Sequence, residues 1–353
     1  MQLGIIGLAE SGKTTIFNAL TRGRQPTGMT AAKVQVHTAV VDVPDPRVDK
    51  LAEIFKPRKV IYAKVTYADI AGLGGEKGEI NGALLNQLSQ MDGFLHVVHC
   101  FEDVNVPHVL GSVDPERDIR IMDEELLIND QIKVESKLKR LQDEHHRGGR
   151  EKVAVEREIA LFERLNAELQ EEKPLRELMI SNDEEKLLGG YGFMTRKPML
   201  IVLNLGEGQK APKVVYDHPR SRVVALQGKL EMEICQLPQK EAQVFLKEYG
   251  IAEPSLSRMI RESYGLLGLQ SFFTTGEKEV HAWTVRHGAT APEAAGVIHS
   301  DMQQGFIRAE VVSYDDLVEL GGMTEARTKG KMRLEGKNYI VQDGDVLTIR
   351  FNI

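Results

Sequence analysis

Short apolar runs alternate with helical segments along the first part of the chain. The opening run MQLGIIGL has the character of a buried strand, and TTIFNALTR follows it with helical character. Further strand patterns are VQVHTAVVDV, VIYAKVTYADI, FLHVVHCF, KPMLIVLNL and SRVVAL. Apolar strands separated by helices predict an α/β fold whose mostly parallel sheet is covered on both faces.

From about Glu124 to Leu178 the sequence becomes rich in Glu, Lys, Arg, Leu and Gln. Apolar side chains recur there at helical spacing on a narrow stripe: Val134, Leu138 and Leu141, then Val155, Ile159, Phe162 and Leu169. Gly148 and Gly149 can turn the chain between the two sets. The pattern predicts an antiparallel helical arm, a coiled coil inserted between strands of the sheet. The alternative is a pair of surface helices that lie flat on the core.

After Thr275 the pattern changes again. The strands KEVHAWTV, IRAEVVSY and KNYIVQDGDVLTIRFNI surround one helix, APEAAGVIHSDM, which predicts a separate small domain. The predicted domains are an α/β domain in two parts (residues 1–123 and 191–275), the arm (124–190) and a C-terminal domain (276–353).

The composition is that of a globular protein, and 353 residues are enough for two or three domains. The net charge of -7 gives no overall basic signal, so any contact with RNA must come from a local patch. Cys100 and Cys235 lack metal-ligand spacing and fit a reducing compartment. No signal segment and no run of about 18 apolar residues is visible, so we expect a cytoplasmic protein.

The sequence from Gly7 to Thr15 has the spacing of a phosphate-binding loop. Gly7-x-x-x-x-Gly12-Lys13-Thr14 follows a predicted strand and opens a predicted helix, as that motif requires. Its glycines let backbone N–H groups surround the β-phosphate, Lys13 bridges the β and γ oxygens, and the Thr14 hydroxyl binds Mg²⁺. The nucleotide-binding residues predicted here are Gly7, Ala9, Glu10, Ser11, Gly12, Lys13, Thr14 and Thr15.

Two further motifs extend the site. Asp69-Ile-Ala-Gly72 ends an apolar strand, where Asp69 can hold a water of Mg²⁺ and the Gly72 amide can sense the γ-phosphate. Asn204-Leu205-Gly-Glu207 ends the strand that carries NKxD in guanine-binding proteins. Its Lys and Asp positions are changed, which favours adenine or a relaxed choice of base.

These motifs resemble those of the YchF/Obg-like ATPase family, P-loop proteins related to translation factors. The segments that carry the resemblance are GLAESGKTTIFNALT, VDVPDPRVDKL, YADIAGL, CFEDVNVPHVLGSVDPERDI, LNLGE and the run from FFTTGEKEVHAWTV to RLEGKNYIVQDGDV. The resemblance covers nearly the whole chain, and this sequence resembles a divergent member of the family. It implies ATP hydrolysis in preference to GTP, a helical arm inserted in the G domain, a C-terminal β-grasp TGS domain and association with ribosomes.

The sequence departs from Ras-like enzymes at Leu73, where those proteins have a glutamine that orients water. A leucine cannot polarise water, so catalysis must use another group. The resemblance transfers a water-positioning role to His108, and Lys13 is the second predicted catalytic residue. The alternative for His108 is a histidine that only caps a loop beside the sheet.

Glu10 stands where the family has an asparagine that is associated with potassium binding. A carboxylate there could ligate K⁺, or it could point to solvent, so potassium dependence stays open. The family's switch I threonine, a Mg²⁺ ligand, falls on Lys33, and the nearby Thr30 could replace it. The predicted metal ligands are thus Thr14, Asp69 and Thr30.

Two basic stretches are the predicted contacts with the ribosome or ribosomal RNA. They comprise Lys137, Lys139, Arg140, His145, His146, Arg147 and Arg150 on the arm, and Arg327, Lys329, Lys331 and Arg333 in the C-terminal domain. The alternative is a solvated helix surface. We expect a monomeric ATPase switch, with two rivals: a module that holds nucleotide with little hydrolysis, and a GTPase with relaxed base recognition.

Overall fold

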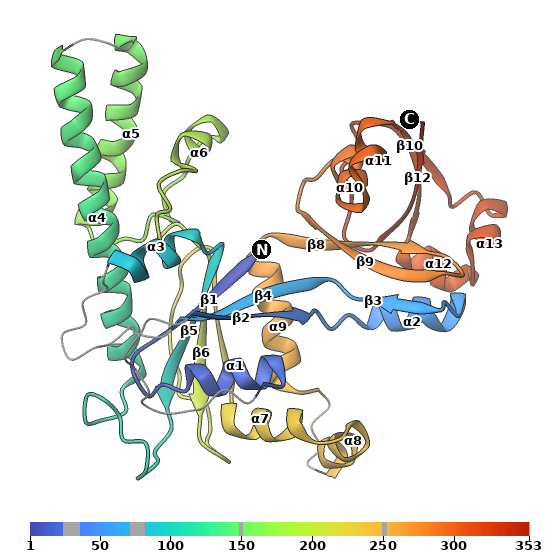
Figure 1. The fold of residues 1–353 in the computed structure, drawn as a ribbon, viewed down its shortest axis with the longest axis horizontal. Helices are drawn as coiled ribbons and strands as arrows, with labels where there is room; N and C mark the ends of the chain where they lie inside the picture. The colour runs from blue at the N-terminus through green and yellow to red at the C-terminus, as the bar shows by residue number, and fades with distance from the viewer. Residues whose placement is uncertain (24–35, 71–81, 148–150, 249–252, 353) are drawn as a thin grey trace. The chain divides into compact units, whose positions relative to one another are not determined.

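The computed structural model describes residues 1–23, 36–70, 82–147, 151–248 and 253–352. The chain divides into two compact units (Figure 1). The first unit comprises Met1–Ala39 and Thr66–Leu256, and the second unit comprises Val40–Val65 and Ser257–Ile353. Five residues that the sequence analysis placed in the site or in a basic stretch lie outside the described residues: Thr30, Lys33, Gly72, Leu73 and Arg150.

A six-stranded sheet forms the centre of the first unit. Across the sheet the order is β2 (Val36–Asp42), β4 (Lys64–Ile70), β1 (Gln2–Ile6), β5 (Gly93–Cys100), β6 (Met199–Leu205) and β7 (Ser221–Leu226). The pairs from β4 to β7 are parallel. The mostly parallel sheet predicted from the alternating strands and helices is therefore confirmed.

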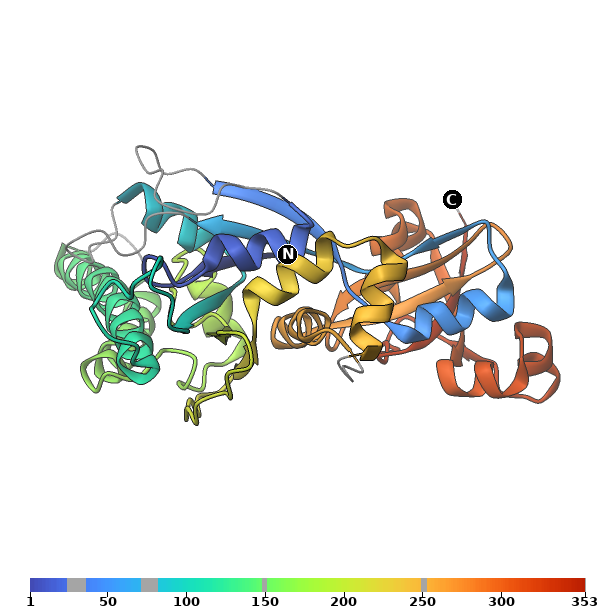
Figure 2. The same ribbon diagram turned by 90° about the horizontal axis from the view of Figure 1, so that it is seen from below.

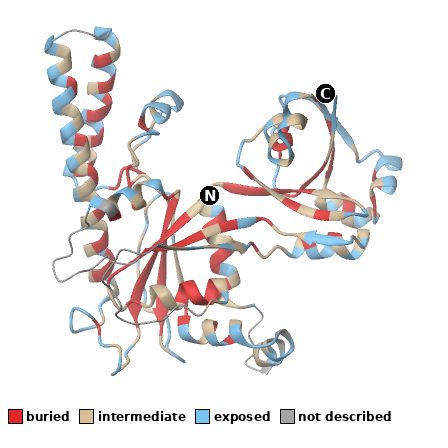
Figure 3. Cartoon of the chain, viewed as in Figure 1, coloured by how far each residue is buried: buried red, intermediate tan, exposed pale blue. Residues whose placement is uncertain are grey.

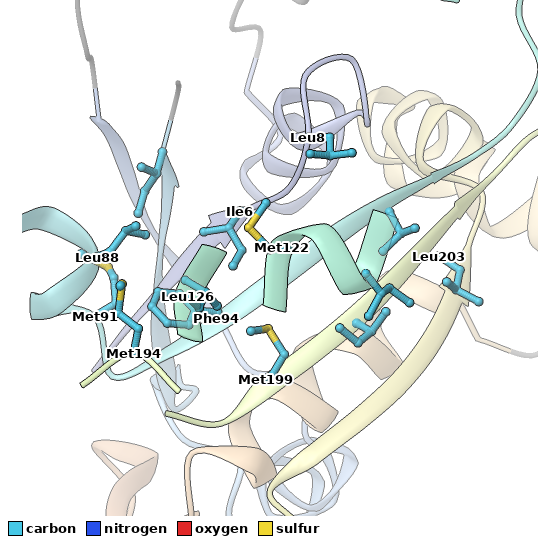
Figure 4. Close-up of a cluster of buried hydrophobic side chains, with 14 of the residues drawn as sticks. Ile6, Leu8, Leu88, Met91, Phe94, Met122, Leu126, Met194, Met199 and Leu203 are labelled. Carbon is cyan, nitrogen blue, oxygen red and sulfur yellow. The ribbon is translucent and has the colours of Figure 1, made fainter. Parts of the chain in front are cut away.

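Helices cover this sheet, so β5 and β6 are buried along their whole length (Figure 3). On one face, α3 (Gly82–Gln90) and the start of α4 (Pro115–Arg147) pack their apolar side chains against the strands. Leu88, Met122 and Leu126 meet Phe94 and Leu203 in this core (Figure 4). The other helices of the unit include α1 (Lys13–Thr21), which packs against α7 (Gly228–Gln236), and also α6 (Asn182–Leu188) and α8 (Gln239–Glu248).

The longest helix, α4, lies side by side with α5 (Lys152–Gln170) in both views of the chain (Figures 1 and 2). The two helices share an apolar core that includes Val134, Leu141, Val155 and Phe162, residues at the spacing from which the arm was predicted. Helix α4 begins at Pro115, earlier than the predicted boundary at 124, because proline suits the first turn of a helix.

The second unit has its own six-stranded sheet. Its order is β11 (Arg333–Glu335), β10 (Phe306–Ser313), β12 (Asp345–Phe351), β8 (Leu269–Thr275), β9 (Glu279–Arg286) and β3 (Lys59–Ile61). Helix α10 (Ala291–Ile298) packs three alanines into the core of this unit, where Phe272 and Phe306 are buried. The remaining helices are α2 (Pro46–Phe55), α9 (Ser255–Leu266), α11 (Ser300–Gln304), α12 (Tyr314–Leu320) and α13 (Met323–Thr328).

The run VIYAKVTYADI is two strands, so its prediction as a single strand is wrong. Its first part belongs to β3, which pairs with β9, and its second part is β4, which pairs with β1. Residues 43–63, which include α2 and β3, therefore belong to the second unit rather than to the sheet around the phosphate loop. Arg47 helps to hold them there, because it binds the carboxylates of Asp45 and Asp343. Within the described ranges, no helix has the length and apolar character needed to cross a membrane.

Candidate nucleotide-binding site

The phosphate loop joins β1 to α1 through backbone conformations that depend on glycine. Gly7 and Gly12 have φ values of +143° and +92°. A Cβ atom at Gly7 would lie 2.3 Å from the Val97 carbonyl oxygen, and one at Gly12 would lie 2.2 Å from Nδ2 of Asn204. Both positions thus exclude side chains by conformation and by space.

Glu10 also has a positive φ, +58°, which is unusual for a residue with a side chain. Left-handed residues inside a loop turn neighbouring backbone N–H groups toward a common point, and such concavities bind anions. Helix α1 has no acidic residue in its first turn, so the positive end of its dipole is not neutralised there. The loop at Glu10 and the start of α1 therefore suit a phosphate group.

Lys13 lies across the loop that precedes it. Its Nζ donates hydrogen bonds to the carbonyl oxygens of Gly7 (2.9 Å) and Leu8 (2.7 Å). Burial lowers the pKa of Lys13 from 10.5 to about 8, although the charges of Asp69 and Glu10 oppose this effect. The Glu10 carboxylate thus stabilises the lysine ammonium, which is the group expected to meet the phosphates.

Thr14 and Asp69 come together as predicted for a Mg²⁺ site. The Thr14 hydroxyl donates to Oδ2 of Asp69 at 3.0 Å, while Oδ1 is buried and has no hydrogen-bond partner among the described residues. Burial raises the pKa of the Asp69 carboxyl, and Thr14 and Lys13 oppose that rise. A hydroxyl beside an unpaired buried carboxylate oxygen is a donor set that fits a hard cation such as Mg²⁺.

Asn204 has a role that the sequence did not indicate. Its Nδ2 donates to the carbonyl oxygen of Ser11 at 2.9 Å, and its Oδ1 accepts from the N–H of Gly228 at 3.0 Å. The side chain is buried, so both bonds are formed away from water. Asn204 therefore ties the phosphate loop to the start of α7. Leu205 ends β6 in a buried position, whereas Glu207 is exposed.

His108 is held on both sides of its ring. Nδ1 accepts a hydrogen bond from the N–H of Leu110 at 3.0 Å, and Nε2 lies 2.6 Å from Oδ2 of Asp118. Arg117 donates two bonds to the other oxygen of that carboxylate. Since Nδ1 is an acceptor, the proton is on Nε2 and points to Asp118. His108 must exchange one of these partners before it can orient a water molecule.

Beneath the loop, His96 of β5 is buried and neither ring nitrogen has a hydrogen-bond partner in the part of the chain that the structure describes. Burial, with a smaller contribution from the charge of Lys13, lowers the pKa of His96 from 6.5 to about 3. The ring is therefore neutral in the folded protein, whereas an unfolded chain protonates it below about pH 6.5.

This difference predicts a loss of stability in acid. The contribution of His96 is complete above its unfolded pKa and declines as the pH falls toward the folded value, because only the unfolded state takes up the proton. Between pH 7.5 and pH 5.0 we expect His96 to lower the free energy of unfolding by about 2 kcal/mol. Urea unfolding at both pH values should show a decrease smaller by this amount in His96→Met than in the wild type.

The exposed His146 provides the control, since His146→Gln should keep the pH dependence of the wild type. An identical decrease in His96→Met and in the wild type would contradict the assignment of this acid sensitivity to His96.

Comparisons with known proteins find relatives that match the chain over nearly its whole length. The YchF-GTPase_C family model, whose description is a protein of unknown function, matches residues 269–352. The chain is 41% identical to the ribosome-binding ATPase YchF of Haemophilus ducreyi and 39% identical to that of Bacillus subtilis, with 99% of each chain covered. It is 36% identical to Obg-like ATPase 1 of Pongo abelii, over 100% of this chain and 92% of that protein.

Among solved structures, that of the Schizosaccharomyces pombe YchF GTPase matches with a TM-score of 0.87 and 32% identity. The match covers 99% of this chain and 97% of the yeast chain. Similarity of this degree over the full length shows that the chain belongs to the YchF family.

Proposed function

We propose that the chain is a nucleotide-dependent switch that binds ATP, hydrolyses it slowly and associates with ribosomes. The observation that carries the proposal is the phosphate loop, in which Lys13 follows a glycine-shaped turn and Thr14 lies 3.0 Å from the Asp69 carboxylate. The names of the bacterial relatives, ribosome-binding ATPases, support the choice of nucleotide and partner. The yeast protein is called a GTPase, so its name does not support a preference for ATP over GTP.

The end of β6 and the loop that follows it favour ATP. Guanine-specific sites place a lysine and an aspartate where this chain has Leu205 and Glu207. Leucine has no ammonium group to pack over a base, and the exposed Glu207 is one methylene longer than aspartate. Loss of this pair removes the main reason for guanine selectivity, and we infer that ATP binds at least as tightly as GTP.

In the proposed reaction Lys13 stabilises negative charge on the β and γ oxygens, while Thr14 and Asp69 hold Mg²⁺. The metal would supply further charge neutralisation at the same oxygens. His108 would orient the attacking water after giving up one of its present partners. Its two occupied ring nitrogens support slow intrinsic turnover, and they also favour the second candidate, a module that holds nucleotide with little hydrolysis.

The arm is the better of the two proposed contacts with ribosomal RNA. Lys137 and His145 pair with acidic residues of α5, but Lys139, Arg140 and Arg147 are exposed near the end of α4. In the C-terminal sequence, by contrast, acidic side chains pair with three of the four basic residues, namely Arg327, Lys331 and Arg333. Unpaired exposed cations gain more from phosphate contacts than cations with carboxylate partners do.

Binding and hydrolysis can test this proposal together. We expect Mg²⁺-ATP to bind at least as tightly as Mg²⁺-GTP in calorimetric titrations, and ribosomes to increase ATP turnover. Rates in K⁺ and Na⁺ buffers show whether Glu10 acts as a cation ligand. A dissociation constant for GTP about tenfold below that for ATP, a difference of about 1.4 kcal/mol, would contradict the adenine preference. Co-sedimentation with ribosomes, with and without an ATP analogue, distinguishes a switch from a constitutive binder.

A further inference from the structure

His99, at the end of β5, is a buried histidine held in one orientation. Its Nε2 lies 3.0 Å from the carbonyl oxygen of Phe101, and its ring stacks on the Phe101 ring with centroids 3.8 Å apart. Because a carbonyl oxygen only accepts hydrogen bonds, the proton is on Nε2. The other ring nitrogen, Nδ1, therefore presents a lone pair.

That lone pair has no hydrogen-bond partner among the described residues, although Nδ1 is buried. Burial and the nearby His108 lower the pKa of His99, which favours the neutral ring. On the neighbouring strand β6, His99 is paired with Asn204, whose side chain bonds to Ser11 of the phosphate loop.

The same ring also lies beside the predicted water-positioning residue. The centroids of His99 and His108 are 4.8 Å apart, and the rings are tilted by 50°. His108 in turn is bonded to Asp118 at the start of α4. His99 consequently lies next to Asn204, which is bonded to the phosphate loop, and next to His108.

We propose that His99 is a positioning residue that fixes the place of the His108 ring relative to the phosphate loop. This inference rests on the proposed ATP hydrolysis for its kinetic consequence, but the positions of the rings do not depend on it. Small displacements of groups that orient a reacting water reduce the rate steeply, whereas binding of the phosphates depends on backbone N–H groups and Lys13.

Two variants separate positioning from packing. His99→Phe keeps a ring that can stack on Phe101 but loses both nitrogens, and His99→Gln keeps one donor and one acceptor without the ring. We expect His99→Phe to lower kcat for ATP about 10- to 100-fold while the Kd for ATP stays within about twofold. His99→Gln should recover most of the lost kcat, and thermal unfolding should confirm that both variants are folded.

A second measurement does not require hydrolysis. In protein with ¹⁵N-labelled histidines, the ring-nitrogen signals of His108 should shift in His99→Phe relative to the wild type. The reason is that the ring beside His108 has lost both of its nitrogens. The exposed-site variant His146→Gln should leave those signals unchanged.

The outcomes distinguish the two proposals. Unchanged His108 signals in His99→Phe, or wild-type kcat in that variant, would overturn the positioning role. If the wild type hydrolyses ATP no faster than Lys13→Ala, the proposed function fails, and the His108 signals still decide whether His99 positions that ring.

Discussion

Replacement of Lys13 by alanine is expected to lower the rate of ATP hydrolysis at least about 100-fold, the cost of removing one preorganised charged donor from a reacting oxygen. The Lys13 ammonium is held by the carbonyl oxygens of Gly7 and Leu8, so it is already directed at the loop that would surround the phosphates. Alanine leaves that position without a donor. Release of phosphate from Mg²⁺-ATP, measured under single-turnover conditions, gives the rate directly.

The matched control is Lys186→Ala, since the side chain of that lysine is 78% exposed on α6, where it pairs with Asp183. It should hydrolyse ATP like the wild type. Turnover that is the same in Lys13→Ala and in the wild type would mean that the activity belongs to a contaminating enzyme. A loss of hydrolysis with unchanged affinity for ATP would show that Lys13 acts on the reacting oxygens and contributes little to binding.

The phosphate loop could be predicted because its determinants are local. Gly7, Gly12, Lys13 and Thr14 are close in sequence, and each is needed for a conformation or a donor within a single turn. The meeting of Thr14 with Asp69 also followed from sequence, since parallel neighbouring strands end at the same edge of a sheet. The phosphate loop and the contact between Thr14 and Asp69 require only that β1 and β4 are neighbours in the sheet.

Other features depend on contacts that no local pattern encodes. Asn204 was predicted as part of the base-binding motif, whereas its bond to Ser11, which joins residues 193 apart in the sequence, was not predicted. The pair formed by His108 and Asp118 also required the path of the loop between β5 and α4. β3 looked like part of the first sheet because it forms one apolar run with β4, yet the two strands pair in different sheets.

The second large effect is expected from Asn204→Ala, which would remove the two hydrogen bonds that the Asn204 side chain makes with Ser11 and Gly228. The carbonyl of Ser11 and the N–H of Gly228 would each lose a buried partner, at a cost of roughly 1–3 kcal/mol per group. The free energy of unfolding should therefore fall by about 2–6 kcal/mol. Because the phosphate loop loses its tie to α7, the Kd for ATP should rise about 10- to 100-fold, a change of about 1.4–2.7 kcal/mol.

Asn204→Asp separates the two bonds. An aspartate can still accept from the Gly228 N–H, but it places a carboxylate oxygen against the Ser11 carbonyl where Nδ2 donated a hydrogen bond. If the tie to Ser11 orders the loop, the Kd for ATP should rise in Asn204→Asp at least as much as in Asn204→Ala. Calorimetric titration measures both, and Asn182→Ala, an exposed asparagine, should match the wild type. Wild-type affinity in Asn204→Asp would mean that the loop keeps its shape through Gly7, Gly12 and Lys13 alone.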